Sequence, residues 1–293
     1  MAKGHILVLP LPAQGHVTPL MELSHRLVDH GFEVTFVNTE AHHARVVGAL
    51  QAAGGTAALT GIHLASIPDG LDDNDDRKDI GKIFDSYSRH MPGHLEQLIA
   101  GMEAAGRPKV KWLVCDVYMW WSFFDVAKKL GIRVAAVWPA AAANLAISFK
   151  IPKLIEDGLL DSKGWFFRDL SIYSILDRIL GSLNVNSDTE CIPTITNGAL
   201  AAGWPERAET FQLAPGIPPL HTSQLPWMNV VAPEAHPVVF ELHIRTGMLT
   251  AHAEMVVCNS FREVEAGAVD LLAWEMVCPL VVVAAGSVLI IHI

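Results

Sequence analysis

The chain has 293 residues, of which 51% are hydrophobic and 18% are charged, so it can bury a substantial core and is not a disordered chain. Its formal net charge of −10 argues against a nucleic-acid partner, because phosphate binding needs Lys and Arg gathered on one face. The four cysteines form no C-x-x-C pair and Pro10 ends the first apolar run early, which together predict a cytoplasmic protein with reduced thiols.

Strands and helices are predicted to alternate from the amino terminus. Residues 5–9 form a short apolar run that Pro10 ends, as in a buried strand. Thr18 is expected to cap the next helix, with Pro19 at its first position and Gly31 after its end. A strand at 32–37, a helix at 41–53 and a strand at 62–67 follow. The acidic stretch after them is interpreted as a solvated loop, because its aspartates lack the spacing of a metal site.

The same alternation continues to residue 156. The predicted elements are a helix at 80–105 with a break at Pro92, a strand at 110–115, a helix at 118–130 ended by Gly131, a strand at 132–138 and a helix at 140–156. Strands and helices at this spacing indicate βαβ units with right-handed crossovers. The predicted fold class is therefore α/β, with a doubly wound parallel sheet.

The alternation is lost after Gly164, and Lys163-Gly164-Trp165 is echoed by Ala202-Gly203-Trp204. A proline-rich surface segment is expected at 205–227, then a helix at 237–252, a strand at 255–258 and a helix at 261–274 capped by Ser260. The apolar tail from Val277 to Ile293 suits a buried strand. A membrane anchor is the alternative, because the tail is at the lower edge of the ~17–25 residues that cross a bilayer.

Two polar residues follow predicted strands that would be neighbours in a doubly wound sheet. His16 comes after the first strand and its turn, and Asp116 comes directly after the strand at 110–115. Ligands bind at this switch point, so the pair could act as a general base and the carboxylate that orients it. Spacing alone favours a structural role, in which the histidine bonds a carbonyl and the aspartate caps a helix. No G-x-G-x-x-G follows the first strand, which argues against a dinucleotide-dependent oxidoreductase.

Four sequence blocks, in this order, resemble plant secondary-product UDP-glycosyltransferases of the GT-B fold, family 1. They are HILVLPLPAQGHVTPLMELSHRL at 5–27, WLVCDVYMWWSFFDVAKKLGIRVAAVWPAAAA at 112–143, LAPGIPPL at 213–220 and MVVCNSFREVEAGA at 255–268. The resemblance implies that the chain is the Rossmann-like amino-terminal domain of such an enzyme, which binds the sugar acceptor.

The resemblance also implies a reaction and its residues. His16 matches the family's catalytic base and Asp116 the carboxylate that orients it. The expected reaction is an inverting, metal-independent transfer of a sugar, glucose by preference, from a UDP-sugar co-substrate to a hydroxyl of a small aromatic acceptor such as a flavonoid or phenolic, with no further cofactor. Trp120 and Asn144 are the candidate acceptor-binding residues, although aromatic side chains on such a helix more often belong to a core. The protein is expected to be a monomer with no membrane partner.

The sequence departs from the family in two respects. The family's donor box, with its H-C-G-W-N-S core, does not occur, so the carboxyl-terminal domain is expected to be missing and the chain to be inactive alone. The alternative function is a non-catalytic module that binds small aromatic ligands. Residues 165–203 have no counterpart in the family pattern, and joining Gly164 to Trp204 restores a natural linker, as if the transcript were altered. The expected organisation is an acceptor domain at 1–164 and 204–268, an atypical insert at 165–203 and an atypical apolar tail at 269–293.

Overall fold

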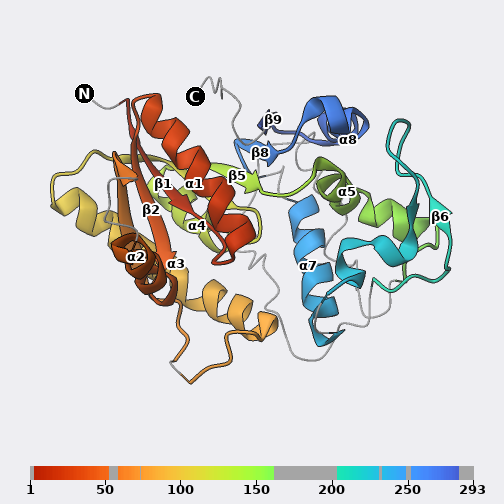
Figure 1. The fold of residues 1–293 in the computed structure, drawn as a ribbon, viewed down its shortest axis with the longest axis horizontal. Helices are drawn as coiled ribbons and strands as arrows, with labels where there is room; N and C mark the ends of the chain where they lie inside the picture. The colour runs from red at the N-terminus through yellow and green to blue at the C-terminus, as the bar shows by residue number, and fades with distance from the viewer. Residues whose placement is uncertain are drawn as a thin grey trace, which may run out of the picture.

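A single seven-stranded sheet organises the protein, for which a computed structural model describes residues 3–52, 59–72, 74–161, 203–230, 233–248 and 252–283. The strand order is β3-β2-β1-β4-β5-β8-β9, and every neighbouring pair is parallel (Figure 1). The strands are β1 (His5–Leu9), β2 (Glu33–Thr39), β3 (Ile62–Ile67), β4 (Val110–Asp116), β5 (Arg133–Trp138), β8 (Met255–Asn259) and β9 (Leu280–Val283). The predicted doubly wound sheet is confirmed, with β1 and β4 adjacent where the strand order reverses.

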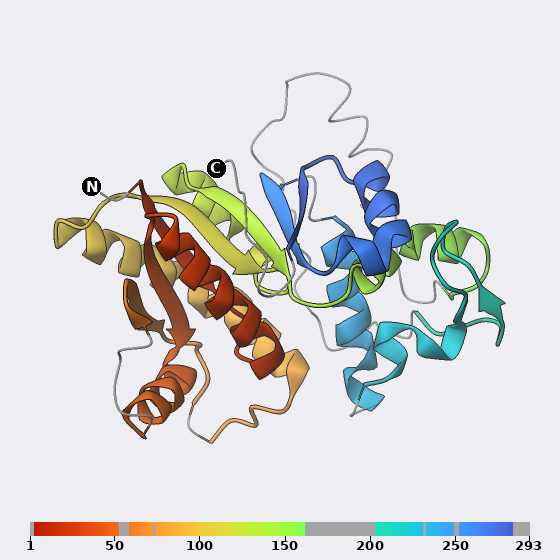
Figure 2. The same ribbon diagram turned by 45° about the horizontal axis from the view of Figure 1, so that its top comes forward.

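Helices cover both faces of this sheet (Figures 1 and 2). They are α1 (Gln14–Asp29), α2 (Glu40–Ala52), α3 (Ile80–Ala104), α4 (Trp120–Leu130), α5 (Ala142–Glu156), α7 (His236–Gly247) and α8 (Arg262–Glu275). One core joins α1 to the sheet through Leu20, Leu23 and Leu27. The core on the opposite face is larger and contains buried residues of α3, α4, α5, α7 and α8. The central strands β1, β5 and β8 are largely apolar on both faces because both faces are buried.

Two predicted helix features were wrong. Helix α1 begins at Gln14, one turn before Thr18, because the carbonyl of Ala13 already accepts the backbone N–H groups of His16 and Val17. Pro19 therefore lies inside the helix, and His16 lies in its first turn. Helix α3 runs through Pro92 without a break, and its buried residues on both sides of the proline pack into the same core.

The segment at 203–230 is less superficial than predicted. It contains a short antiparallel pair, β6 (Thr210–Phe211) with β7 (Leu220–His221), and three-residue 3₁₀ turns. Trp227 is fully buried and donates its indole N–H to the carbonyl of Gly203 at 2.8 Å. Its ring packs against Phe240 of α7. The predicted insert, residues 165–203, lies outside the described residues apart from Gly203.

The end of the chain adds one strand to the sheet. The prediction that Ser260 caps α8 was wrong. Its hydroxyl donates to the carboxylate of Glu265 instead. Strand β9 lies at the sheet edge beside β8, and the rest of the predicted tail, from residue 284 on, lies outside the described residues. Within the described part of the chain, no helix is both long and apolar enough to cross a membrane.

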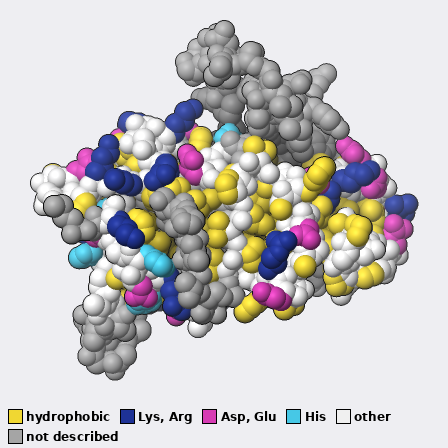
Figure 3. Space-filling model, turned by 90° about the horizontal axis from the view of Figure 1, so that it is seen from above, with side chains coloured by type: hydrophobic (Ala, Val, Ile, Leu, Met, Phe, Trp, Pro, Cys, Tyr) yellow, Lys and Arg dark blue, Asp and Glu magenta, His cyan; other side chains and the backbone are white. Residues whose placement is uncertain are grey.

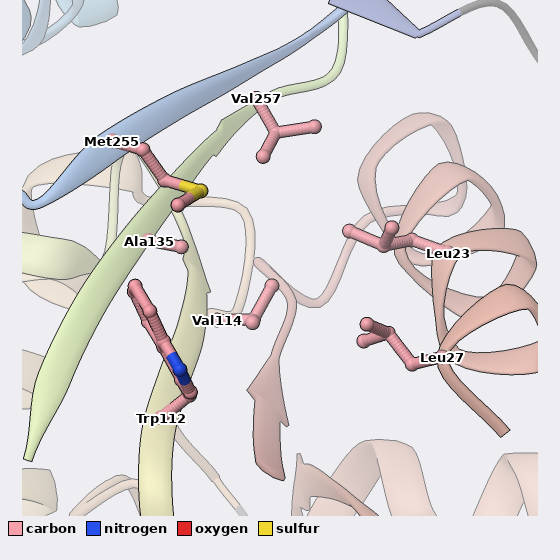
Figure 4. Close-up of a pocket in the computed structure, with 7 residues that line it drawn as sticks. All are labelled: Leu23, Leu27, Trp112, Val114, Ala135, Met255 and Val257. Atoms are coloured by element: carbon pink, nitrogen blue, oxygen red, sulfur yellow. The ribbon is translucent and has the colours of Figure 1, made fainter. Parts of the chain in front are cut away.

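Apolar surface remains on the face of the molecule that carries β8, β9 and α8. Figure 3 shows hydrophobic side chains gathered in the middle of this face. Around α8, the exposed side chains include Phe261, Val264, Trp274 and Val277. Beside α1, a small cleft is lined by hydrophobic residues of α1, β4, β5 and β8, among them Leu23, Trp112 and Met255 (Figure 4). Its lining contains no charged group, so this cleft is not a candidate catalytic site.

Candidate catalytic site

The carboxyl ends of β1 and β4 bring His16 and Asp116 together. Asp116 is the last residue of β4, and His16 lies in the first turn of α1, directly after β1 and its connecting turn. The His16 Nδ1 atom lies 2.6 Å from Asp116 Oδ2, although the two residues are 100 positions apart in sequence. The strand order makes this contact possible, because β1 and β4 are neighbours in the sheet and both end at the same edge.

Asp116 is held at both oxygens. Its side chain is fully buried, Oδ2 faces His16, and Oδ1 accepts the backbone N–H of Tyr118 at 2.9 Å. The ring of His16 is 23% exposed, so one edge of the imidazole reaches solvent. An ionised carboxylate only accepts hydrogen bonds, so it selects the tautomer of His16 that carries its proton on Nδ1. This leaves Nε2 unprotonated and able to take a proton.

Tyr118 forms one wall beside the base. Its ring centroid lies 5.8 Å from that of His16 and 5.9 Å from that of Trp138. Burial and the nearby carboxylate of Asp116 raise the pKa of the Tyr118 hydroxyl, so this group is neutral at pH 7. Sequence reasoning missed Tyr118 as a site residue. Its position two residues after Asp116 was the available signal.

His243 of α7 lies behind Tyr118. Its Nε2 is 3.3 Å from the Tyr118 hydroxyl, and its Nδ1 is 2.8 Å from Ser148 Oγ of α5. Burial lowers the pKa of His243 to about 3, so the ring is neutral at pH 7. Nothing in the sequence pointed to His243, because α7 joins this region only through the tertiary fold.

The two predicted acceptor-binding residues lie near the same edge of the sheet. Trp120 begins α4, but its side chain lies outside the described part of the structure. Asn144 is exposed in the first turn of α5, which follows β5. Its backbone carbonyl lies 3.4 Å from Ser148 Oγ, and among the described hydrogen bonds its side chain has none to His16 or Asp116. An acceptor role for either residue stays a prediction.

Glu265 closes the amino terminus of α5. Its two carboxylate oxygens accept the backbone N–H groups of Ala142 and Ala143 at 2.9 and 3.0 Å, and the Ser260 hydroxyl donates to the same carboxylate. Burial acts to raise the pKa of Glu265, but these hydrogen bonds outweigh it and lower the pKa overall. The end of α5 beside the site is thus filled by a carboxylate of the protein itself. No set of three or more metal-ligating side chains occurs among the described residues.

Comparisons with known proteins agree with this architecture. Residues 3–129 match the sequence profile of the family described as "Glycosyltransferase, N-terminal domain". The chain is 33% identical over 275 residues to UDP-glycosyltransferase 83A1 of Arabidopsis thaliana, covering 92% of this chain and 51% of that protein. It is 27% identical over 282 residues to 7-deoxyloganetin glucosyltransferase of Catharanthus roseus, covering 92% of this chain and 49% of the relative.

Solved structures show the same fold. A UDP-glucose:anthocyanidin 3-O-glucosyltransferase in complex with UDP superimposes with a TM-score of 0.64 at 18% identity, over 99% of this chain and 55% of that one. A UDP-glucosyltransferase from Polygonum tinctorium gives a TM-score of 0.61 at 20% identity, over 98% of this chain and 53% of that one. The chain spans about half the length of the curated relatives it matches. It belongs to the plant UDP-glycosyltransferases of the GT-B fold and corresponds to their amino-terminal domain.

Proposed function

We propose that this chain provides the acceptor site and the general base for transfer of a sugar from a UDP-sugar to a hydroxyl group of a small molecule. The observation that carries the proposal is the contact of 2.6 Å between His16 Nδ1 and the buried Asp116 carboxylate, at the edge of the sheet where ligands bind. In this contact a partly exposed imidazole meets a fully buried carboxylate, which is the arrangement expected of a base and the group that orients it.

The proposed mechanism is a single displacement. His16 Nε2 takes the proton of the acceptor hydroxyl as the acceptor oxygen forms a bond to the anomeric carbon of the sugar. The bond from that carbon to the phosphate oxygen breaks, and UDP leaves with the electron pair. Asp116 stabilises the imidazolium that results. One displacement from the opposite side inverts the anomeric carbon, and none of these steps calls for a metal or a further cofactor.

A phenolic acceptor, such as a flavonoid, fits this base best. A phenol has a pKa of ~10, which is much closer to that of imidazole than the pKa of an aliphatic alcohol is. The names of the relatives support glucose as the sugar, and one solved relative is an anthocyanidin 3-O-glucosyltransferase. We assign Trp120 and Asn144 to the acceptor pocket as part of the same proposal.

A second candidate function is binding of small aromatic ligands without turnover. No H-C-G-W-N-S box occurs in the 293 residues, so binding of UDP-sugar by this chain is the property that separates the two functions. In the family pattern that box places the diphosphate at a helix amino terminus, where N–H groups and the helix dipole stabilise it. The two functions share one acceptor site and differ only in whether UDP-sugar is bound and used.

The proposal also places a monomeric protein in the cytoplasm, within secondary metabolism. Among the described cysteines, Cys115, Cys258 and Cys278 are free thiols, which supports a reducing compartment. Size-exclusion chromatography coupled to light scattering tests the monomer, and imaging of a fluorescent fusion tests the location.

Calorimetry on the purified chain separates the two functions. A flavonol and UDP-glucose are titrated in turn, and UDP release is then measured with both present. Sugar transfer predicts binding of both ligands and UDP release that His16→Ala abolishes, while the control His25→Ala, in the same helix, keeps it. Flavonol binding without any UDP-glucose binding selects the binding module for this chain. If the flavonol does not bind at all, both proposals fail.

A further inference from the structure

Three polar side chains from separate parts of the fold are joined by hydrogen bonds in a row behind His16. Tyr118 lies between β4 and α4, His243 in α7 and Ser148 in α5. The Tyr118 hydroxyl meets His243 Nε2 at 3.3 Å, and His243 Nδ1 meets Ser148 Oγ at 2.8 Å. His243 is 2% exposed and Ser148 is 1% exposed. Buried polar groups destabilise a protein unless they are paired, so a fully paired chain of this kind is strongly constrained in geometry.

We assign the directions of these hydrogen bonds starting from Ser148, on the basis that a serine inside a helix commonly bonds back to the carbonyl four residues earlier. The Ser148 hydroxyl has one hydrogen and donates it to the carbonyl of Asn144, at 3.4 Å, one helical turn earlier. Ser148 Oγ then accepts from His243, which requires the proton of the neutral ring on Nδ1. His243 Nε2 is therefore an acceptor, and the Tyr118 hydroxyl donates to it.

Tyr118 contacts both members of the candidate catalytic pair. Its backbone N–H bonds Asp116 Oδ1 at 2.9 Å, and its ring lies beside the ring of His16 at a centroid distance of 5.8 Å. The His16 side chain has one described hydrogen bond, from Nδ1 to Asp116, so motion of the ring about that contact has to be limited by the groups packed against it. A fixed ring at its side restricts this motion, and a base must be held within hydrogen-bonding reach of its proton to be effective.

We propose that His243 is a positioning residue for the base: it holds the Tyr118 hydroxyl, and the Tyr118 ring in turn holds His16 in line with Asp116. This inference rests on the role of His16 in the proposed function. It assigns a task to a buried histidine that has no described contact with His16 or Asp116. It also gives a reason for the burial of His243 in α7, an element that is distant in sequence from β1 and β4.

Nuclear magnetic resonance of the ¹⁵N-labelled chain, without any substrate, tests this proposal. Long-range ¹H–¹⁵N spectra report the tautomer of each histidine, and exchange with water of the His16 Nδ1 proton reports how firmly the base is held. We expect His243 to be neutral with its proton on Nδ1. In His243→Phe, the His16 Nδ1 proton should exchange roughly fivefold to tenfold faster, the effect that loss of one buried hydrogen bond produces.

Two further variants separate positioning from stability. His243→Gln keeps a side-chain oxygen that can accept from Tyr118, so it should restore the exchange rate of the parent chain. Tyr118→Phe removes only the hydroxyl and should match His243→Phe, which keeps the test decisive if the latter variant does not fold. The control is His236→Phe: His236 is also buried and in α7, but it stacks on Trp204 and has no described contact with Tyr118. This control should leave the His16 proton unchanged.

The proposal is overturned if a folded His243→Phe chain keeps the His16 Nδ1 exchange rate of the parent. It is also overturned if a folded Tyr118→Phe chain keeps the exchange rate of the parent. Because no measurement involves sugar transfer, failure of the proposed function would appear separately, as absent UDP release with the tautomers and exchange rates as expected here.

Discussion

At the scale of single residues, the protonation of His16 depends on a backbone contact of Asp116. Asp116 Oδ1 accepts the N–H of Tyr118, so in Asp116→Asn the amide oxygen stays at that position and the NH₂ group faces His16 Nδ1. Two donors cannot share a hydrogen bond, so the His16 proton should move to Nε2 and the base should be lost. We expect the ¹⁵N shifts of His16 to show the reversed tautomer, and any sugar transfer to fall by roughly 10³–10⁴-fold. Asp125→Asn, on the exposed side of α4, should change neither, and an unchanged tautomer in Asp116→Asn would contradict the assignment.

His243 also predicts how stability depends on pH. Its pKa is lowered from 6.5 to about 3 by burial, and its described contacts are to the neutral groups of Tyr118, Ser148, Trp138 and Trp227. Between these two pKa values the unfolded chain binds a proton at this residue and the folded chain does not. The free energy of unfolding should therefore fall as the pH drops from 6.5 towards 3, by up to about 1.4 kcal/mol per pH unit from this group. Urea unfolding at pH 7, 6 and 5 measures this change in the free energy of unfolding. In His243→Phe, the free energy of unfolding should fall less steeply with falling pH, because the contribution of His243 is absent.

The sequence located the two central residues of the site but not their surroundings. His16 and Asp116 could be predicted because they follow strands whose adjacency is a property of the fold class. The chain of Tyr118, His243 and Ser148 could not, because its contacts depend on how α5 and α7 pack together. Aromatic side chains on such a helix more often belong to a core than to a ligand pocket, and Phe123 of α4 does, since it is fully buried in the larger cluster.

At the scale of elements, Glu265 is predicted to hold α5 in place. Its backbone is non-helical, with φ −118° and ψ 31°, and this kink in α8 accompanies the contact of its carboxylate with two N–H groups of α5. Charge-assisted hydrogen bonds at a helix start are strong, so Glu265→Ala should lower the free energy of unfolding by about 1–3 kcal/mol. Because the pKa of Glu265 is lower in the folded chain, its stabilising contribution is fully present at pH values above its ordinary pKa of 4.5. The contribution is lost as the pH falls through the lowered pKa of the folded chain.

Urea unfolding of matched variants measures the contribution of Glu265. Glu263→Gln is the control, since Glu263 lies in the same helix with an exposed side chain. A loss of stability for Glu263→Gln as large as for Glu265→Ala would show that the charge of α8, and not the contact with α5, matters.

Strands were predicted more accurately than helix starts. The strand at 62–67 has the predicted bounds, with Gly61 before it and Pro68 after it, and that at 110–115, which is mostly buried, extends by one residue. Helix starts depend on which group satisfies the first N–H groups, and α1 and α8 use none of the expected side-chain caps. The seventh strand, β9, was left open between a strand and a membrane anchor, since a short apolar run suits either.

At the scale of the whole molecule, the residues just before and just after the segment 162–202 lie next to each other. The Asp161 N–H donates to the carbonyl of Trp204 at 2.9 Å, and the Gly203 N–H lies 3.4 Å from the carbonyl of Asp161. Leu160 forms an antiparallel bridge with Pro205. These contacts are those of a β-hairpin whose two ends are already in place.

A shorter chain could close this hairpin with a tight turn. If Gly164 were joined to Trp204, it would take the place of Gly203, and Asp161-Ser162-Lys163-Gly164 would be four residues with a hydrogen bond from the last N–H to the first carbonyl. Asp at the first position and Gly at the fourth are favoured in a type I turn. Gly203 has a φ of +87°, and a Cβ there would lie 2.5 Å from the ring of Phe240, so glycine is needed at this position. Gly164 supplies it.

Deletion of residues 165–203 should therefore leave the fold intact. Closing a loop of that length costs roughly 2–3 kcal/mol more chain entropy than closing a two-residue turn, so the shortened chain should be at least as stable as the parent in urea. The His16–Asp116 contact, monitored through the His16 Nδ1 proton, should be unchanged. The matched control is Gly164→Val in the shortened chain, whose side chain would collide with Phe240 and should destabilise it by several times the effect of Ser162→Ala in the same turn. A shortened chain that fails to fold, while the parent folds, would mean that the segment is part of the domain and that the hairpin ends meet only because the segment holds them.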